Sequence, residues 1–244
     1  MIIESNAKGV PFYTQIKDLD KRAKQPAFLQ GNDMKTLVFC AGAKDPNLSV
    51  LQQISSDLLI GVDRGASTLV AHGYTPDYAI GDFDSSEPPE QCRHVIRLPT
   101  DKDDTDLEVA LLSVCERVGE ENISQIIIVG ALGAGRLDHL LTNIWLAHQP
   151  RFAPYLHKIR MVEANSITRF FGAGEHVWLH EADKKYMSFI GLTPIKKLSI
   201  KGVKYPVEAK DYPSPVALVS NECLGSMIRF SLEEGILCVV QSND

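Results

Sequence analysis

The sequence has no long hydrophobic run: none of its apolar stretches approaches the roughly 20 residues that a helix needs to cross a bilayer. It also has no run of Lys and Arg, and its net charge is -6, so a nucleic acid is not expected as a partner. The N-terminus lacks the apolar core and the small-residue cleavage site of a signal peptide. These absences predict a cytoplasmic protein that binds neither a membrane nor a nucleic acid.

Cysteine is scarce as well, and its pattern excludes two kinds of site. The five cysteines are odd in number and scattered, and none shows the close spacing of a zinc site. Cys40 and Cys238 lie inside apolar runs, which is typical of buried thiols. We therefore expect reduced, buried cysteines and no redox centre.

The character of the chain changes twice. Residues 1–33 are polar and without a sustained period, which indicates an N-terminal extension, either a tail or a non-native start. Residues 34–152 alternate short apolar runs with helical patterns, as a parallel α/β sheet does. Residues 153–244 show short, regularly spaced apolar runs without a helical period, which predicts an all-β sandwich. The predicted fold class is α/β, with a Rossmann-like parallel-sheet domain followed by a β-sandwich domain.

Individual elements can be assigned within these domains. The α/β domain is expected to contain strands at 35–41, 58–62, 78–80, 94–98 and 125–129. The sandwich is expected to contain strands at 159–162, 167–171, 177–180, 186–190, 198–200, 217–220, 227–230 and 236–240. One helix should start after Thr105, which forms a capping box with Glu108, and another near Leu137.

Acidic residues follow three of the strands predicted in the α/β domain. Asp63 follows the second strand, Asp82 and Asp84 follow the third, and the acidic segment 101–106 follows the fourth. In an open parallel sheet, ligands bind outside the carboxyl ends of the strands. Carboxylates gathered there repel one another unless a cation lies among them, and Mg²⁺ takes oxygen ligands and commonly arrives with substrate phosphates. The pattern predicts a metal-assisted phosphate-transfer enzyme.

The fifth predicted strand leads into a loop of small residues that includes Gly133 and Gly135. Small residues let the backbone approach an anion closely, and the N-terminus of the next helix points to the same place. Arg136 adds a planar donor suited to phosphate oxygens. The loop is neither a Walker A motif nor a dinucleotide-binding fingerprint, so taken alone it is weak evidence.

The acidic segment after the fourth strand also has a structural interpretation. Asp104 and Asp106 can simply favour a helix start, where the helix dipole stabilises negative charge. Asp101 and Asp103 are as typical of solvated loop charges as of ligands. Sequence alone leaves both interpretations open for this segment.

Other candidates have similar alternatives. The Asp-x-Asp pair can form a turn, although two carboxylates around a single Phe after a buried strand favour a metal site. Arg136 and Asp138 can form a structural ion pair. Trp145 is expected in the core. The segment Ser220-Asn221-Glu222 is typical of a turn, yet at a sandwich edge it can also hold a ligand.

Taken together, the chain resembles the thiamine pyrophosphokinase family from about residue 34 to the C-terminus. The matching segments are Asp63-Arg64-Gly65-Ala66, Gly81-Asp82-Phe83-Asp84-Ser85, Asp101-x-Asp103-x-Thr105-Asp106, Gly133-x-Gly135-Arg136-x-Asp138 and Ser220-Asn221-Glu222. The resemblance implies an α/β domain followed by a β-sandwich, and a homodimer with active sites between the subunits. It also implies Mg²⁺-dependent transfer of the pyrophosphoryl group of ATP to the hydroxyl of thiamine, giving thiamine diphosphate and AMP.

The resemblance further implies residue roles. The catalytic residues would be Asp82, Asp84, Asp106, Arg136 and Asp138, of which the first three would hold Mg²⁺. The residues that would contact the co-substrate ATP are Asp63, Lys102, Asp103, Thr105, Gly133, Gly135 and Arg136. Those that would contact thiamine are Ser220, Asn221 and Asp138.

Three alternative functions stay open at this point. The first is a related pyrophosphokinase that acts on another alcohol, such as a hydroxymethylpterin. The second is a phosphatase with an aspartyl nucleophile, although its Asp-x-Asp motif would be expected after the first strand and Asp82 follows the third. The third is a non-catalytic nucleotide sensor that keeps the site without turnover.

Overall fold

The structure, a computed structural model, describes residues 34–43, 45–84, 87–133 and 136–244. It divides the chain into two compact units, one ending at Lys158 and the other running from Ile159 to Asp244. The predicted extension 1–33 lies outside the described residues, and the predicted boundary after residue 152 stays a prediction. Across the described ranges, no helix has both the length and the apolar character that crossing a bilayer requires.

The first unit is built on a parallel sheet. Its strands are β1 (Lys35–Cys40), β2 (Leu58–Val62), β3 (Tyr78–Gly81), β4 (His94–Arg97) and β5 (Ile123–Val129). They lie in the order β5-β1-β2-β3-β4, and every neighbouring pair is parallel. All residues of β2 and the last four of β5 are buried, as expected for strands covered on both faces. The strands predicted here are confirmed to within two residues at each end.

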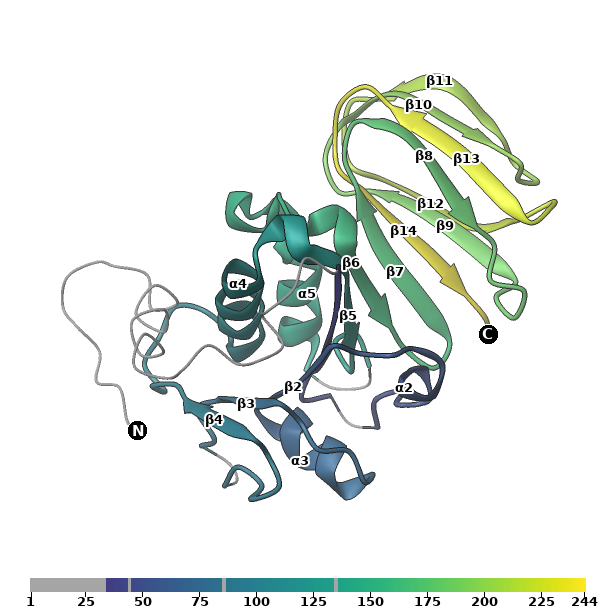
Figure 1. Ribbon diagram of the computed structural model, residues 1–244. Coiled ribbons are helices and arrows are strands. Elements are labelled where there is room, and N and C mark those ends of the chain that lie inside the picture. The colour runs from purple at the N-terminus through teal and green to yellow at the C-terminus, as the bar shows by residue number, and fades with distance from the viewer. Residues whose placement is uncertain (1–33, 44, 85–86, 134–135) are drawn as a thin grey trace. The chain divides into compact units, whose positions relative to one another are not determined.

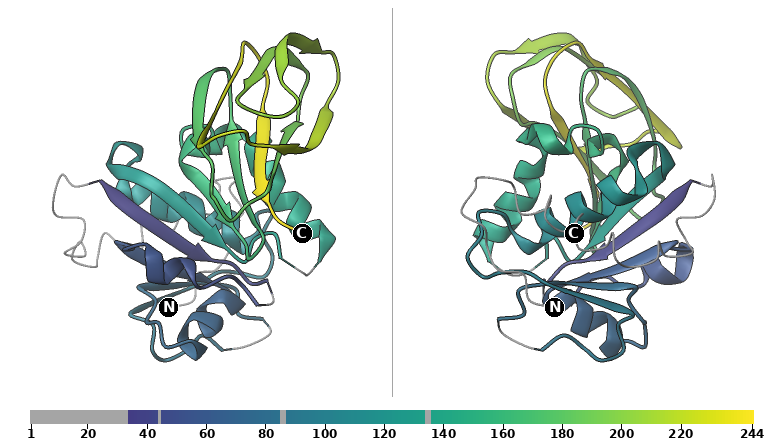
Figure 2. Two further views of the ribbon diagram at one scale, coloured as in Figure 1. Left: turned by 90° about the vertical axis from the view of Figure 1, so that its right-hand side faces the viewer. Right: turned by 60° about the vertical axis from the view of Figure 1, so that its left-hand side comes forward.

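The first unit also contains helices. They are α2 (Val50–Gln53), α3 (Arg64–Ala71), α4 (Asp106–Val118) and α5 (Leu137–Trp145). Helices α3 and α4 lie on opposite faces of the sheet (Figures 1 and 2). The predicted capping box of α4 is confirmed, because Glu108 N–H donates to Thr105 Oγ1 and the Glu108 carboxylate accepts from Thr105 N–H. This cap fixes where α4 begins, immediately beside the acidic segment.

Helix α5 carries an apolar stripe that faces solvent. Leu137, Leu141 and Trp145 follow one another at intervals of four residues and are 68%, 45% and 54% exposed. Residues at this interval lie on one face of a helix. The expectation that Trp145 is a core residue is therefore wrong: helical periodicity finds the apolar face of a helix but not what covers that face.

The second unit consists of antiparallel strands. They are β6 (Ile159–Val162), β7 (Ser166–Phe171), β8 (Gly174–Leu179), β9 (Tyr186–Gly191), β10 (Ile195–Lys201), β11 (Val207–Tyr212), β12 (Val216–Glu222), β13 (Met227–Leu232) and β14 (Leu237–Ser242). One set lies in the order β12-β9-β14-β7-β6 and the other in the order β11-β10-β13-β8. The polar strand β11 was not predicted: its sequence, VEAKDY, contains no apolar run, and none of its residues is buried.

The two sheets of this unit pack through aromatic side chains. Phe171 and Phe189 come from the first sheet, and Phe230 comes from the second. The ring centroid of Phe230 lies 4.9 Å from that of Phe171 and 5.5 Å from that of Phe189, both in edge-to-face geometry. Trp178 of β8 is only 5% exposed. Alternate inward side chains thus form the core of this unit, whose strands form the two sheets seen as ribbons in Figures 1 and 2.

Candidate active site

A cavity of about 340 Å³ opens at the carboxyl ends of the parallel strands of the first unit. Residues that follow β1, β2 and β5 line it, together with the first turns of α4 and α5. The lining includes Gly42, Asp63, Arg64, Thr105, Asp106, Gly130, Gly133, Arg136, His139 and Asn143. The chain leaves β1 toward β2 on one side, while β5 lies on the other side of β1. The cavity therefore occupies the place where open parallel sheets bind their ligands.

Asp63 enters this site through an unusual backbone conformation. It directly follows β2 and has φ 46° and ψ −123°, a positive φ that is uncommon for a residue with a Cβ. Its N–H donates to Ile80 O at 2.8 Å. A Cβ added to Gly81 would lie 2.8 Å from Asp63 Cα, and one added to Gly65 would lie 1.9 Å from Cys40 O. These two glycines allow the ends of β1, β2 and β3 to approach one another, which positions the Asp63 carboxylate.

The two residues of the Asp-x-Asp pair, Asp82 and Asp84, are separated by the buried Phe83. Phe83 has φ 51°, is 6% exposed and packs with Ala66 and Ala79. Asp82 is half-buried and Asp84 is exposed, and Asp84 N–H donates to Asp82 Oδ1 at 3.3 Å. The two carboxylates therefore meet different environments although only one residue separates them.

Asp63, Asp82 and Asp106 form a group of carboxylates, and one oxygen of each lies within 4.8 Å of the others. Oδ1 of Asp63 is buried and accepts no hydrogen bond from the described residues, and the buried Oδ1 of Asp106 faces the Lys102 ammonium at 3.0 Å. A buried carboxylate oxygen without a donor is costly, and oxygen donors in such a group are the ligands that a hard divalent cation prefers. The residues present therefore fit Mg²⁺.

Lys102 is the cation within this group. Its Nζ donates to Asp82 Oδ2 at 2.8 Å and to Pro99 O at 2.9 Å, and it lies 3.0 Å from Asp106 Oδ1 as an ion pair. Burial lowers the pKa of Lys102, but the hydrogen bond to Asp82 and the charge of Asp106 raise it more. Burial raises the pKa of Asp106, and the Lys102 ammonium only partly opposes this. One ammonium among three carboxylates leaves two negative charges, the charge that one divalent cation neutralises.

Arg136 and Asp138 lie at the start of α5 and form a bidentate pair. Arg136 Nη2 and Nε donate to the two Asp138 oxygens at 2.5 and 3.1 Å. The side chains are 73% and 61% exposed. The hydrogen bond from Arg136 lowers the pKa of Asp138, and the same bond raises the pKa of Arg136. The ion pair considered from the sequence is present, on the rim of the cavity.

The structure gathers most of the predicted ATP and metal residues but not all of them. Asp63, Thr105, Asp106, Gly133 and Arg136 line the cavity, and Lys102 and Asp82 contact this set through the carboxylate group. Asp84 and Asp103 are exposed, and Asp84 is not part of the three-carboxylate group found among the described residues. Gly135 lies outside the described residues.

Two of the predicted thiamine residues, Ser220 and Asn221, lie in β12 of the second unit, not in a turn as the sequence suggested, whereas the third, Asp138, lies in α5. Ser220 has φ 57° at an irregularity in the pairing of β12 with β9, and its N–H donates to Ser188 Oγ at 3.1 Å. Asn221 is 5% exposed, and its side chain exchanges two hydrogen bonds with the backbone of Tyr205, both 2.9 Å long. Asn221 therefore has a structural role whatever else it binds.

Three of the polar and charged residues that line the cavity were not assigned from the sequence: Arg64, His139 and Asn143. Asn143 Nδ2 donates to Ala131 O at 2.7 Å and so ties α5 to the loop that follows β5. A signal for two of them exists. His139 and Asn143 are four residues apart at the start of a helix that follows a glycine-rich loop, so both face the same side.

Comparisons with known proteins identify the family. Residues 51–160 match the model of the thiamin pyrophosphokinase catalytic domain, and residues 176–237 match that of the vitamin B1 binding domain of the same enzymes. The thiamine pyrophosphokinase of Bacillus subtilis is 33% identical over 221 residues, which is 86% of this chain and 100% of that protein. The chain belongs to the thiamine pyrophosphokinase family. The family and the enzyme class expected from the sequence are thus confirmed.

Solved structures of the family have the same fold. The thiamin pyrophosphokinase family protein of Enterococcus faecalis is 32% identical and aligns with a TM-score of 0.78 over 86% of this chain and 99% of that one. The Bacillus subtilis enzyme is also 32% identical, with a TM-score of 0.75 over 86% and 100% of the two chains. The α/β fold with a further antiparallel sheet is therefore that of the thiamine pyrophosphokinases.

Proposed function

We propose that this chain transfers the pyrophosphoryl group of ATP to the hydroxyl of thiamine in a Mg²⁺-dependent reaction, giving thiamine diphosphate and AMP. The observation that carries the proposal is the group of Asp63, Asp82 and Asp106 around the Lys102 ammonium, beside the cavity at the strand ends. Such a group has little use in a site for an uncharged ligand, whereas it suits a metal-bound polyphosphate.

Asp63, Asp82 and Asp106 would hold Mg²⁺, since one oxygen of each lies within 4.8 Å of the others and the buried Oδ1 of Asp63 accepts no hydrogen bond from the described residues. The ion supplies neutralisation of phosphate charge and alignment of the transferred group. Asp63, first assigned to ATP, thereby joins the proposed ligands. Asp84 stays a predicted ligand, and its exposed carboxylate would have to turn toward the other three.

ATP would occupy the cavity of the first unit, which we interpret as Rossmann-like because its ligand site lies beside β1, where the strand order reverses. Thr105, Gly133 and Arg136 border the space for the phosphates, and Lys102 contacts Asp106, which lines the same cavity. The start of α5 adds backbone N–H groups, to which anions bind. Gly135 and the exposed Asp103 keep their predicted roles as ATP contacts.

Arg136 and Asp138 would exchange partners during the reaction. Arg136 is 73% exposed, so its guanidinium can turn from Asp138 to a phosphate without breaking a buried contact. Asp138 would then lose the donor that lowers its pKa and become a better acceptor for the hydroxyl proton of thiamine. Arg136 would stabilise the charge that develops on the transferred group.

Thiamine would contact Ser220 and Asn221, and its cationic ring suits an acidic site. The chain would act as a homodimer, for which the exposed stripe of Leu137, Leu141 and Trp145 supplies an apolar surface. We place the enzyme in the cytoplasm, where ATP is available and cysteines stay reduced.

A nucleotide product assay with ATP, thiamine and Mg²⁺, with and without EDTA, tests the proposal. AMP that forms only with thiamine and metal together is the expected result, and ADP as product would contradict it. A matched reaction with a hydroxymethylpterin discriminates the related pyrophosphokinase. ATP binding without any product would favour the sensor, and a trapped phospho-aspartate would favour the phosphatase.

A further inference from the structure

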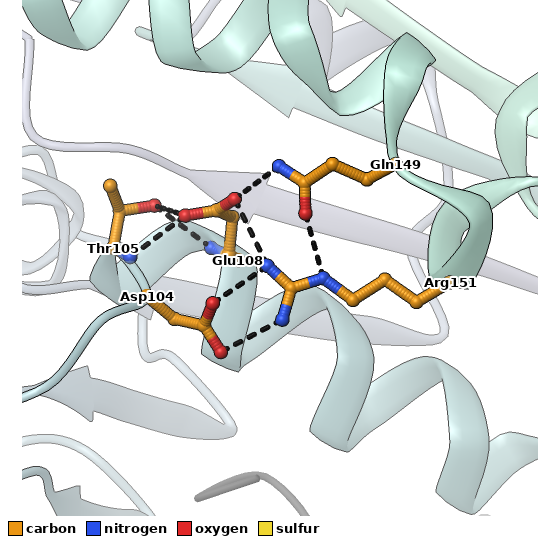
Figure 3. A network of polar contacts seen from close by, with 5 residues as sticks. All are labelled: Asp104, Thr105, Glu108, Gln149 and Arg151. Atoms are coloured by element: carbon orange, nitrogen blue, oxygen red, sulfur yellow. Dashed lines mark hydrogen bonds and ion pairs between the residues drawn. The ribbon is translucent and has the colours of Figure 1, made fainter.

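A polar network lies behind the first turn of α4 (Figure 3). Its centre is Arg151, in a single 3₁₀ turn at Pro150–Phe152. The guanidinium makes a bidentate contact with Asp104, Nη1 to Oδ2 at 2.8 Å and Nη2 to Oδ1 at 2.7 Å. Nη2 also donates to Glu108 Oε1 at 3.2 Å. One arginine therefore holds two carboxylates of the segment that starts α4.

The network leaves the Glu108 carboxylate fully hydrogen-bonded. Glu108 Oε2 accepts from the N–H and the hydroxyl of Thr105, both at 2.8 Å. Glu108 Oε1 accepts from Gln149 Nε2 and from Arg151. Gln149 in turn accepts from Arg151 Nε at 2.7 Å. Because the Glu108 side chain is only 6% exposed, these donors replace the water that it lost on folding.

The arginine itself is fixed on its other side. Its guanidinium carbon lies 5.4 Å from the ring centroid of Phe152, which is 1% exposed. The planar guanidinium of Arg151, held by the Phe152 ring and by two carboxylates, therefore has a fixed orientation, which the flexible ammonium of a lysine would not have.

The position of this network relative to the carboxylate group is what matters for function. Asp104 and Glu108 lie two residues before and two residues after Asp106. Thr105 and Asp106 line the cavity, whereas Arg151 contacts the chain on both sides of them. Fixing the chain at both flanking positions fixes the direction in which Asp106 presents its carboxylate to Asp63 and Asp82.

We propose that Arg151 is a positioning residue that holds Asp106 in the geometry that binds the divalent cation. The inference rests on the metal site of the proposed function. Residues that orient a metal ligand are commonly worth 10- to 100-fold in metal affinity. Arg151 acts through the backbone and not on the Asp106 carboxylate, so we expect an effect near the lower limit of that range.

The experiment measures Mn²⁺ binding to the full chain by the loss of the free-ion electron paramagnetic resonance signal. Arg151→Met keeps an apolar stem on Phe152 and removes the fork, and we expect Mn²⁺ affinity to fall roughly 10-fold. Arg151→Lys should lose less than Arg151→Met, because it keeps the positive charge beside the two carboxylates although it cannot reproduce the planar bidentate contact. The control is Arg93→Met, which breaks the 2.6 Å pair with Asp77 and should leave Mn²⁺ affinity unchanged.

A second variant keeps the test decisive if Arg151→Met does not fold. Asp104→Asn retains the arginine but weakens its bidentate contact, so Mn²⁺ affinity should again fall, and the double variant should lose less than the two single losses combined. Unchanged Mn²⁺ affinity in folded Arg151→Met or Asp104→Asn would overturn the inference alone. A wild-type chain that leaves all Mn²⁺ free would overturn the proposed metal site and the inference with it.

Discussion

Replacing Asp82 by Asn removes the charge of one carboxylate and keeps the size and shape of the side chain. The variant keeps Oδ1, which accepts from Asp84 N–H, but it turns a neutral amide toward Lys102 and removes one of three negative charges from the group. Removing a single group that stabilises transition-state charge typically costs about 10²–10³ in turnover. We expect a loss of this size for Asp82→Asn, on the proposal that the group holds Mg²⁺.

The fold should survive this change. Breaking a fully buried ion pair costs about 3–5 kcal/mol because it leaves a buried charge without a partner. Lys102 instead keeps Pro99 O and the Asp106 carboxylate, and one of three mutually repelling charges is gone. The free energy of unfolding should therefore fall by much less than that. For a chain of this length, a loss of about 1 kcal/mol lowers Tm by about 2–4 °C.

The assay measures AMP release at saturating ATP, thiamine and Mg²⁺, with thermal unfolding in parallel. Asp101→Asn is the matched control: it removes the same charge from an exposed side chain of the neighbouring loop and should leave turnover within about twofold of wild type. Asp82→Asn at the wild-type rate would refute the metal assignment. A collapse of Tm in the same variant would show that Asp82 is mainly a structural partner of Lys102.

Three further outcomes are expected. Arg136→Ala should raise the KM for ATP and lower kcat with little change in Tm, because its side chain is 73% exposed; unchanged kinetics would refute the phosphate role. Asp84→Asn should lose far less turnover than the Asp82 variant if the three-carboxylate group suffices, whereas an equal loss would make Asp84 a ligand. Burial raises the pKa of Cys238 to about 12 and also raises that of Cys115, whereas Cys92 and Cys223 are only half-buried. A thiol reagent at pH 8 should therefore label Cys92 and Cys223 first, and all five cysteines only after unfolding. Rapid labelling of all five in the native chain would contradict this burial.

The sequence was sufficient where a pattern is local. The strands of the first unit follow from short apolar runs between turn residues, and the start of α4 follows from the spacing of Thr105 and Glu108. The placement of acidic residues after consecutive strands located the cavity, because parallel strands end at one edge of the sheet.

The rest depended on contacts between distant parts of the chain. Helix α3 was missed because it starts directly after Asp63, whose positive φ no residue pattern announces. The same backbone conformation places the Asp63 carboxylate beside those of Asp82 and Asp106. Because the sequence does not show this conformation, Asp63 was assigned to ATP and not to the metal. Arg151 lies 47 residues from Asp104 in the chain, so no spacing rule connects them.

The two tryptophans of the chain divide between its two units. Trp145 is 54% exposed on α5, and Trp178 is 5% exposed between the sheets of the second unit. An aqueous quencher such as iodide does not reach Trp178, whereas it reaches Trp145 wherever no partner subunit covers the stripe on α5, so the two residues give separate fluorescence signals without any label. The loss of the blue-shifted Trp178 emission then reports unfolding of the β unit alone, while Trp145 reports on the helix that begins at Leu137, beside the proposed phosphate site.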